Sequence, residues 1–249
     1  MAVSTLVFLG GLFFITIFGS SASPVPMDNC RYNLIGNMEG TRGCEVVHHD
    51  AYIAIYCDGK LSSSVRKILA KYTQYGCRQP IYLRLEHPRF PITPALFHGV
   101  QSRLYRLELW SLQSDIKLAQ AFRGLPALET LTLQFNKTPR NQTLVLRQDL
   151  FGGLEALQLL RLYTEAVPVR LASGAFEPLR GLRCLYFSGE NVECGCGFDE
   201  FTRWKAGREG RMLGEMPDRY IPGTVNQCSS TLQCRIKGKS SAQRNDECP

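Results

Sequence analysis

Leucine and phenylalanine recur with a common spacing through the middle of the chain. The unit [AL]-F-x-[GP]-[LV]-x-x-L-x-x-L-x-[LF] occurs four times, and its leucine triplets begin at Leu104, Leu128, Leu157 and Leu182. The first copy carries one extra residue before Leu104, and Leu83 and Leu85 fit the same frame one unit earlier. Each L-x-L predicts a short strand whose alternate side chains point inward, and no unit can bury its leucines alone. The pattern therefore predicts stacked units that share one core.

These repeats resemble the units of extracellular leucine-rich-repeat proteins, which are about 20–29 residues long. The resemblance implies an α/β solenoid, a horseshoe with parallel strands on its concave face and a disulfide-bonded cap at each end. The expected organisation is a signal peptide (1–22), an N-terminal cysteine-rich cap (23–79), about five repeats (80–192) and a C-terminal cysteine-rich cap (193–249).

The segments on either side of the repeats also have periodic patterns. Residues 44–59 resemble the hairpin of an amino-terminal leucine-rich-repeat cap, and within them Ala54 and Tyr56 alternate with Ile53, Ile55 and Cys57 as in a half-buried strand. Residues 63–75 carry their apolar side chains on one face and predict a helix. Residues 198–204 predict a second helix, which we expect to cover the last repeat with Phe198, Phe201 and Trp204.

The amino terminus predicts the compartment. Residues 5–18 form an uncharged apolar run that small residues follow, which predicts a signal peptide cleaved after Ala22. A membrane anchor is the alternative, but the run is shorter than the span of about 20 residues that a bilayer requires. No later segment is long and apolar enough to cross a membrane. We therefore expect a secreted, extracellular protein.

The ten cysteines lie towards the two ends of the repeats, with none between Cys77 and Cys184, and their even number in such a chain predicts disulfide bonds. Four precede the repeats and six lie in or after the last repeat: Cys30, Cys44, Cys57 and Cys77, then Cys184, Cys194, Cys196, Cys228, Cys234 and Cys248. Sequence does not fix the pairing, and Cys30–Cys44 with Cys57–Cys77 is one of three arrangements for the first four. For the last six, the resemblance implies Cys194–Cys228 and Cys196–Cys248, which leaves Cys184–Cys234.

The close pair in ECGCGFDEFTRW admits two other interpretations, a redox couple and a metal site. A reactive thiolate needs a lowered pKa, whereas Asp199 and Glu200 raise the pKa of a neighbouring thiol. Zinc sites favour C-x₂-C spacing, which Cys194 and Cys196 lack. No nucleophile elbow, phosphate-binding loop or dinucleotide fingerprint occurs. We therefore expect a non-enzymatic protein that uses no metal or cofactor.

Charge and sequons modify this picture slightly. The formal net charge is +7, partly concentrated in residues 234–244, where contact with a polyanion competes with the simpler interpretation of a solvated loop. Nucleic acid is not an expected partner of a secreted chain. Two sequons occur, and we favour Asn141, in an expected loop, over Asn136, which we expect to point inward.

The outward positions of the expected strands form the candidate binding site. They are Tyr82, Arg84, Arg106, Glu108, Trp110, Gln134, Arg161, Tyr163 and Tyr186. Tyr, Trp and Arg are over-represented among binding hot spots, although Trp110 has the alternative role of covering a neighbouring leucine. The mixed charge favours an extracellular protein or receptor as the partner, in a recognition, adhesion or innate-immune role. The alternative is a non-catalytic accessory or inhibitor subunit of a secreted enzyme.

Overall fold

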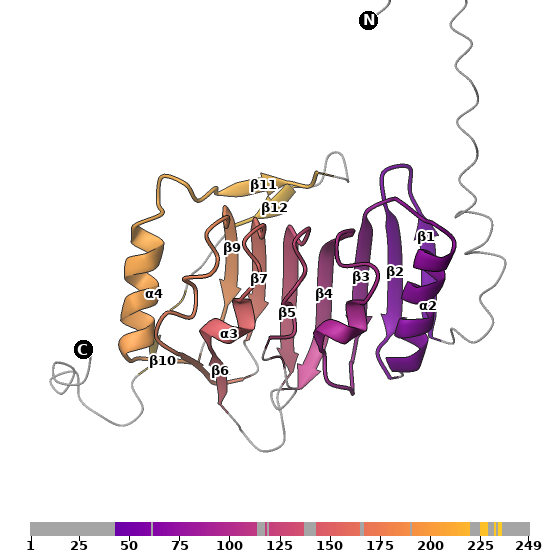
Figure 1. Ribbon diagram of the computed structural model, residues 1–249. Coiled ribbons are helices and arrows are strands. Elements are labelled where there is room, and N and C mark those ends of the chain that lie inside the picture. Colours follow the sequence, from indigo (N-terminus) through magenta and orange to yellow (C-terminus); the bar gives the residue numbers. More distant parts are fainter. Residues whose placement is uncertain are drawn as a thin grey trace, which may run out of the picture.

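A computed structural model describes residues 43–228 apart from 61, 114–117, 119, 137–142, 165–166, 190 and 220–224, together with 232, 234 and 235. The expected signal peptide, Cys30, Asn141 and Cys248 lie outside these residues, as does most of the basic segment 234–244. Figure 1 shows the main strands side by side in one row, with helix α2 at one end of the row and helix α4 at the other.

Strands dominate the described chain. The largest sheet contains β1 (Cys44–His48), β2 (Ile53–Asp58), β3 (Ile81–Glu86), β4 (Leu104–Gln113), β5 (Thr130–Asn136), β7 (Leu159–Tyr163) and β9 (Cys184–Ser188) in that spatial order. A second sheet contains β6 (Leu144–Leu146), β8 (Val169–Leu171), β10 (Val192–Glu193) and β13 (Cys234–Arg235), and β11 (Glu215–Pro217) pairs with β12 (Val225–Gln227). The helices are α2 (Ser62–Gln74), α3 (Gln148–Phe151), α4 (Cys196–Ala206) and the 3₁₀ helix η1 (Pro94–Phe97).

The expected horseshoe solenoid of the leucine-rich-repeat type is wrong as a fold class. The seven-stranded sheet is mixed, because β1 runs antiparallel to β2 while the other neighbours run parallel. Helices are few: η1, of four residues, lies between β3 and β4, and α3, also of four residues, lies between β6 and β7. The leucine pattern specifies strands and their alignment but not the segments that connect them, which is why it failed to predict the architecture.

Each predicted L-x-L lies within a strand, and the pairing of the strands aligns the inward side chains in rows. One row runs Leu83, Leu107, Leu131, Leu160 and Leu185, and the next runs Leu85, Leu109, Leu133, Leu162 and Phe187. All ten side chains are at most 4% exposed. Burial of one such side chain contributes roughly 1.5–3 kcal/mol, so these rows form the main core.

The predicted hairpin and both predicted helices are confirmed. Strands β1 and β2 form the hairpin, and α2 buries the apolar face that includes Val65, Ile68 and Leu69. At the other end, α4 buries Phe201 against Phe176, with ring centroids 4.8 Å apart. Phe198 and Trp204 pack beside it against the same core. Helix α4 therefore covers the core beyond β9, as its aromatic residues predicted.

The contact between α4 and β8 requires a glycine. A Cβ atom on Gly197 would lie 2.0 Å from the carbonyl oxygen of Leu171, whereas one on Gly195 would meet nothing within 4 Å. We predict that Gly197→Ala lowers the free energy of unfolding by about 2–3 kcal/mol, because α4 must shift away from β8. Guanidinium denaturation measures this change.

Gly195→Ala is the matched control. Its backbone is extended, so alanine fits there without strain, and we expect a change below about 0.5 kcal/mol. Equal stabilities of the two variants would contradict the proposed packing of α4.

Candidate functional site

The face of the seven-stranded sheet opposite the main core, here called the outward face, carries every candidate binding residue. Alternation along the strands places Tyr82 and Arg84 on β3, Arg106, Glu108 and Trp110 on β4, Gln134 on β5, Arg161 and Tyr163 on β7, and Tyr186 on β9. Strand pairing aligns Arg84 with Glu108 and Arg161 with Tyr186, so the residues form one continuous surface.

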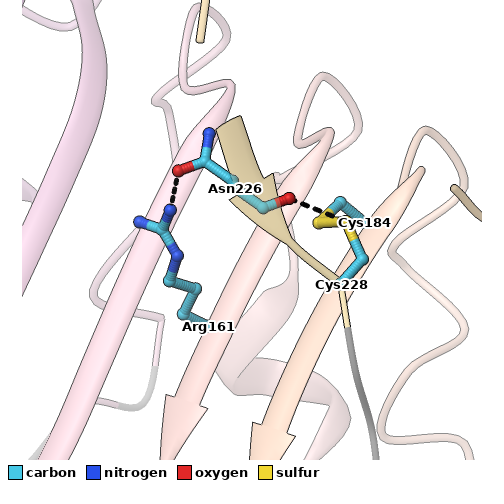
Figure 2. The surroundings of a disulfide bond; sticks show 4 residues. All are labelled: Arg161, Cys184, Asn226 and Cys228. Atoms are coloured by element: carbon cyan, nitrogen blue, oxygen red, sulfur yellow. Dashed lines mark hydrogen bonds between the residues drawn. A yellow bond between two sulfur atoms is a disulfide. The ribbon is translucent and has the colours of Figure 1, made fainter. Parts of the chain in front are cut away.

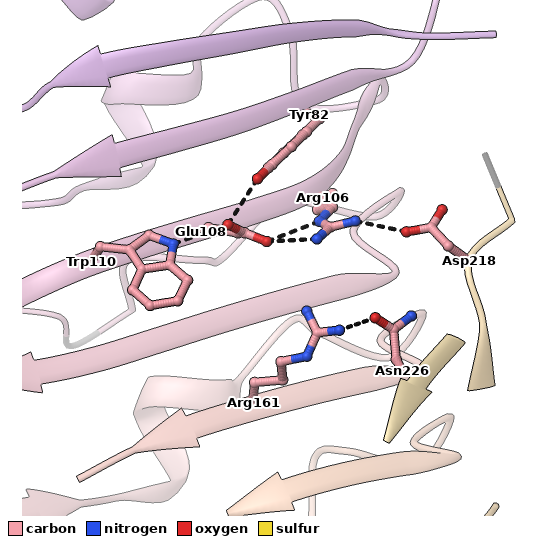
Figure 3. A network of polar contacts seen from close by, with 7 residues as sticks. All are labelled: Tyr82, Arg106, Glu108, Trp110, Arg161, Asp218 and Asn226. Atoms are coloured by element: carbon pink, nitrogen blue, oxygen red, sulfur yellow. Dashed lines mark hydrogen bonds and ion pairs between the residues drawn. The ribbon is translucent and has the colours of Figure 1, made fainter. Parts of the chain in front are cut away.

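Glu108 is the centre of a hydrogen-bond network on this face (Figure 3). Arg106 donates from Nε and Nη2 to its Oε1, at 3.0 and 2.8 Å. Tyr82 and Trp110 donate to its Oε2, at 2.8 and 2.9 Å. The Glu108 side chain is only 4% exposed, and the remaining Nη1 of Arg106 pairs with Asp218 at 2.7 Å. We call these five residues the Glu108 network.

Contacts within the Glu108 network shift the pKa values of Glu108 and Tyr82. Burial by itself raises the pKa of Glu108, but the Arg106 charge and the donors of Trp110, Arg106 and Tyr82 outweigh burial and hold that pKa below its ordinary value. Burial and the Glu108 charge raise the pKa of Tyr82, whose hydroxyl therefore remains a donor at neutral pH. The carboxylate is thus a fully satisfied acceptor that fixes the side chains around it, rather than an acid available for catalysis.

A row of half-buried rings follows the carboxyl-terminal half of the outward face. Trp110 stacks with Tyr163 at a centroid distance of 5.8 Å, and Tyr163 contacts Tyr186 at 5.1 Å. We call these three residues the aromatic row. The guanidinium of Arg84 lies 4.8 Å from the Trp110 ring and pairs with Glu86 at 2.6 Å. The contacts described for Trp110 are all with outward-face residues: Tyr163, Arg84 and Glu108.

An irregularity in β4 lies next to Trp110. The pairing of β4 with β5 shifts by one residue between Leu109 and Leu112, and Ser111 within this bulge has φ +57°. A residue other than glycine pays strain to adopt this left-handed conformation. Bulges of this kind re-aim neighbouring side chains. The extra residue shifts the alternation of β4, so that Leu112 lies in the core opposite Phe135 while Trp110 keeps its outward position.

A segment near the carboxyl end crosses the amino-terminal half of the outward face. β11 and β12 lie beyond the amino ends of β7 and β9 in Figure 1. We call residues 215–219 and 225–228, which include these two strands, the strap. The strap is joined to β9 by the disulfide Cys184–Cys228 and to β7 by a hydrogen bond from Arg161 to Asn226 (Figure 2). Asp218 connects it to the Glu108 network.

Sequence analysis missed the strap. An outward-pointing cysteine at the start of β9 was the available signal, because a side chain at that place bonds to whatever covers the face. The disulfide also corrects the expected pairing: Cys184 bonds Cys228, so Cys194–Cys228 and Cys184–Cys234 are both wrong. Cys184 lies on the outward face, where the strap rather than α4 is its neighbour.

The amino-terminal pairing also differs from the arrangement considered first. Cys44 bonds Cys57 across the β1–β2 hairpin, where strand pairing sets the two residues directly opposite. Cys30–Cys44 with Cys57–Cys77 is therefore wrong. Cys77, Cys194 and Cys196 are also disulfide-bonded. The close pair Cys194–Cys196 therefore holds no free thiol for redox exchange.

Asn136 differs from its expected orientation. Its side chain is exposed, because β5 continues to this residue and alternation buries Phe135 instead. Among the residues that the structure describes, no group of three or more His, Cys, Asp or Glu side chains is arranged to hold a metal ion. Within that same part of the chain, no helix is long and apolar enough to cross a membrane.

In comparisons with known proteins, no family model and no curated protein matches the sequence. The fold and site define a disulfide-bonded protein built on a mixed β-sheet, with an aromatic and charged outward face that its own strap partly covers.

The acid dependence of stability tests the Glu108 network. We predict that Glu108→Gln lowers the free energy of unfolding at pH 7 by about 3 kcal/mol, because Arg106 keeps a buried charge with only Asp218 opposite. The pKa of Glu108 is depressed in the folded state, so its contribution is present above the ordinary value of about 4.3 and is lost as pH falls through the folded value. Denaturation at several pH values measures the difference between wild type and variant.

Glu86→Gln is the control, because the Arg84–Glu86 pair is far more exposed. Loss of the Arg84–Glu86 ion pair should lower the free energy of unfolding by less than about 1 kcal/mol. A Glu108→Gln difference that is equally small, or that persists unchanged at pH 2, would contradict the role of the buried carboxylate.

Proposed function

We propose that the protein is secreted and non-enzymatic, and that it binds an extracellular protein through the outward face. The observation that carries this proposal is the aromatic row. Trp110, Tyr163 and Tyr186 are half-buried on a sheet surface, in mutual contact and outside the main core. Rigid aromatic side chains of this kind supply large contact area at low entropic cost, and they dominate binding energies at protein interfaces.

The site is organised before any partner arrives. The indole N–H of Trp110 is held by Glu108, and its ring is stacked with Tyr163. Arg84 is held by Glu86 beside the same ring. Because these side chains are already ordered, binding loses less conformational entropy than it would on a flexible surface.

The charge pattern supports a protein partner. Arginines alternate with acids on the outward face, as in Arg84 with Glu86 and Arg106 with Glu108. Such a mosaic favours specific pairing with a protein over attraction to a uniform polyanion.

The size of the surface indicates how the partner is placed. The five strands β3 to β9 span about 20 Å at 4.8 Å spacing, and five residues along a strand span about 17 Å. The resulting area is well below the roughly 800 Å² that each partner buries in a standard interface. A partner that covers the aromatic row therefore also contacts the strap or the edge of the sheet.

Secretion has independent support. Cys44–Cys57, Cys184–Cys228 and three further disulfide-bonded cysteines indicate an oxidising compartment. We predict that expression in animal cells releases a chain that begins at Ser23, since the apolar amino-terminal run serves as a signal peptide. Mass spectrometry of the medium measures this, and retention of the full chain in membranes would contradict it.

Site-specific crosslinking tests the binding face. Gln134 lies on β5 beside Tyr163 of the aromatic row, so a photo-reactive residue placed there should crosslink one defined protein from the extracellular fluid of the source organism. The same reagent at the exposed Arg123, on a connecting turn, should not. Mass spectrometry then identifies the crosslinked protein.

The affinity between this chain and the purified crosslinked protein tests the contribution of the aromatic row. We predict that Trp110→Ala combined with Tyr163→Ala weakens binding at least about 100-fold, because each hot-spot ring contributes about 2 kcal/mol or more. Tyr75→Ala is the control, since Tyr75 packs against the core on the opposite face. Unchanged affinity of the double variant would place the binding site elsewhere.

A further inference from the structure

Two arginines on the outward face differ sharply in their partners. Arg106 makes three contacts with carboxylates through Nε, Nη1 and Nη2. Arg161, two strands away, makes one hydrogen bond, from Nη2 to the side-chain oxygen of Asn226. Within the described chain no carboxylate pairs with it. Figure 3 shows the two guanidinium groups on the same face, one enclosed by acids and the other facing an amide.

This difference matters because Arg161 is half-buried. Burial and the neighbouring charge of Arg106 lower the pKa of Arg161, which means that its surroundings disfavour the cation. An arginine offers five N–H donors and loses its charge only under extreme conditions, so it remains a cation here. The charges of Glu108 and Asp218 partly oppose this effect, but within the described chain neither carboxylate pairs with Arg161. A carboxylate that bonds directly to this guanidinium therefore gains free energy there.

The strap supplies a second donor at the same place. Asn226 is 8% exposed and accepts the Arg161 hydrogen bond through Oδ1, which leaves the two N–H groups of its amide. Those groups donate to no other described residue. The disulfide Cys184–Cys228 holds this part of the strap two residues from Asn226 (Figure 2). Guanidinium and amide donors are therefore fixed side by side, next to the aromatic row.

We propose that Arg161 and Asn226 bind the side-chain carboxylate of an Asp or Glu residue of the protein partner. This inference rests on the proposed function and specifies the chemistry of the contact. A planar carboxylate matches the fork of a guanidinium group and accepts from both donors at once. Tyr163 and Trp110 then contact the apolar residues that flank the acidic one.

Small probes test the site without the partner. The probe is N-acetylglutamate N-methylamide, which offers one side-chain carboxylate; the neutral match is N-acetylglutamine N-methylamide. Titration of the ¹⁵N-labelled protein follows the Arg161 Nε–H and the Tyr163 backbone amide by NMR. We expect saturable shifts with the glutamate probe, with a Kd on the order of 10 mM or below, as one charge-assisted contact provides. The glutamine probe should produce no saturable shift.

Three variants assign the contact. Arg161→Gln should abolish the response of the Tyr163 amide to the glutamate probe. Asn226→Asp should do the same, because it places a permanent carboxylate against Arg161 while the fold is retained. Arg123→Gln removes one charge from a connecting turn and should leave the response unchanged. With the crosslinked partner, Arg161→Gln should weaken binding about tenfold to a hundredfold.

Other outcomes overturn the proposal in distinct ways. Equal shifts with both probes, or a response that survives in Arg161→Gln, would show that the carboxylate does not bind here. Tighter binding of inorganic phosphate, or of the α-carboxylate of N-acetylalanine, would replace the side-chain carboxylate with another anion. Saturable probe binding together with a partner insensitive to Trp110 and Tyr163 would instead contradict the proposed function. Loss of probe binding alone would leave that function standing.

Discussion

The arrangement of the outward face depends on one buried carboxylate. A charge that is removed from water must be surrounded by donors, and Glu108 obtains four hydrogen bonds from three side chains. Those donors are the ones that define the face, because Tyr82 comes from β3 and Arg106 and Trp110 from β4. The requirement to satisfy this charge therefore orients side chains on two strands and, through Asp218, on the strap.

The strap and the aromatic row are two consequences of this constraint. The Arg106–Asp218 pair, with both side chains at most 12% exposed, and the Cys184–Cys228 disulfide attach the strap at two distant points. The strap covers part of the outward face and leaves open the aromatic row together with the side chains of Arg161 and Asn226. The aromatic row can select a partner by apolar fit, and Arg161, which pairs with no carboxylate of the described chain, can select it by charge.

Sequence predicted the strands but not the fold class. The leucines at alternate positions define a core face, so the outward residues followed from simple alternation, including Trp110 and Tyr163. The connections were beyond this pattern, which contains no information about the shortness of η1 and α3. The antiparallel direction of β1 followed from the expected hairpin and not from the leucines. Helix α4 was predictable because Phe201 and Trp204 lie on one helical face next to a core that had to be covered.

The candidate site was predictable in composition but not in organisation. Glu108 was recognised as outward, yet the network around it extends through Arg106 to Asp218, which lies 110 residues after Glu108 in the chain. The partner of Arg161 is also distant in sequence, 65 residues later, and Asn226 carries no pattern that marks it as a neighbour. Cys184 was the only local hint that a distant segment crosses the face, and the pairing implied by family resemblance pointed it elsewhere.

The indole N–H of Trp110 reports most directly on whether the buried carboxylate organises the face. Its NMR resonance should be protected from exchange at pH 7, because the group donates to Glu108 in a half-buried site. As pH falls, the resonance should shift with a midpoint below the ordinary carboxyl pKa of about 4.3, in step with loss of the Glu108 charge. An indole that exchanges as fast as free tryptophan, or one that titrates at or above that value, would contradict the account.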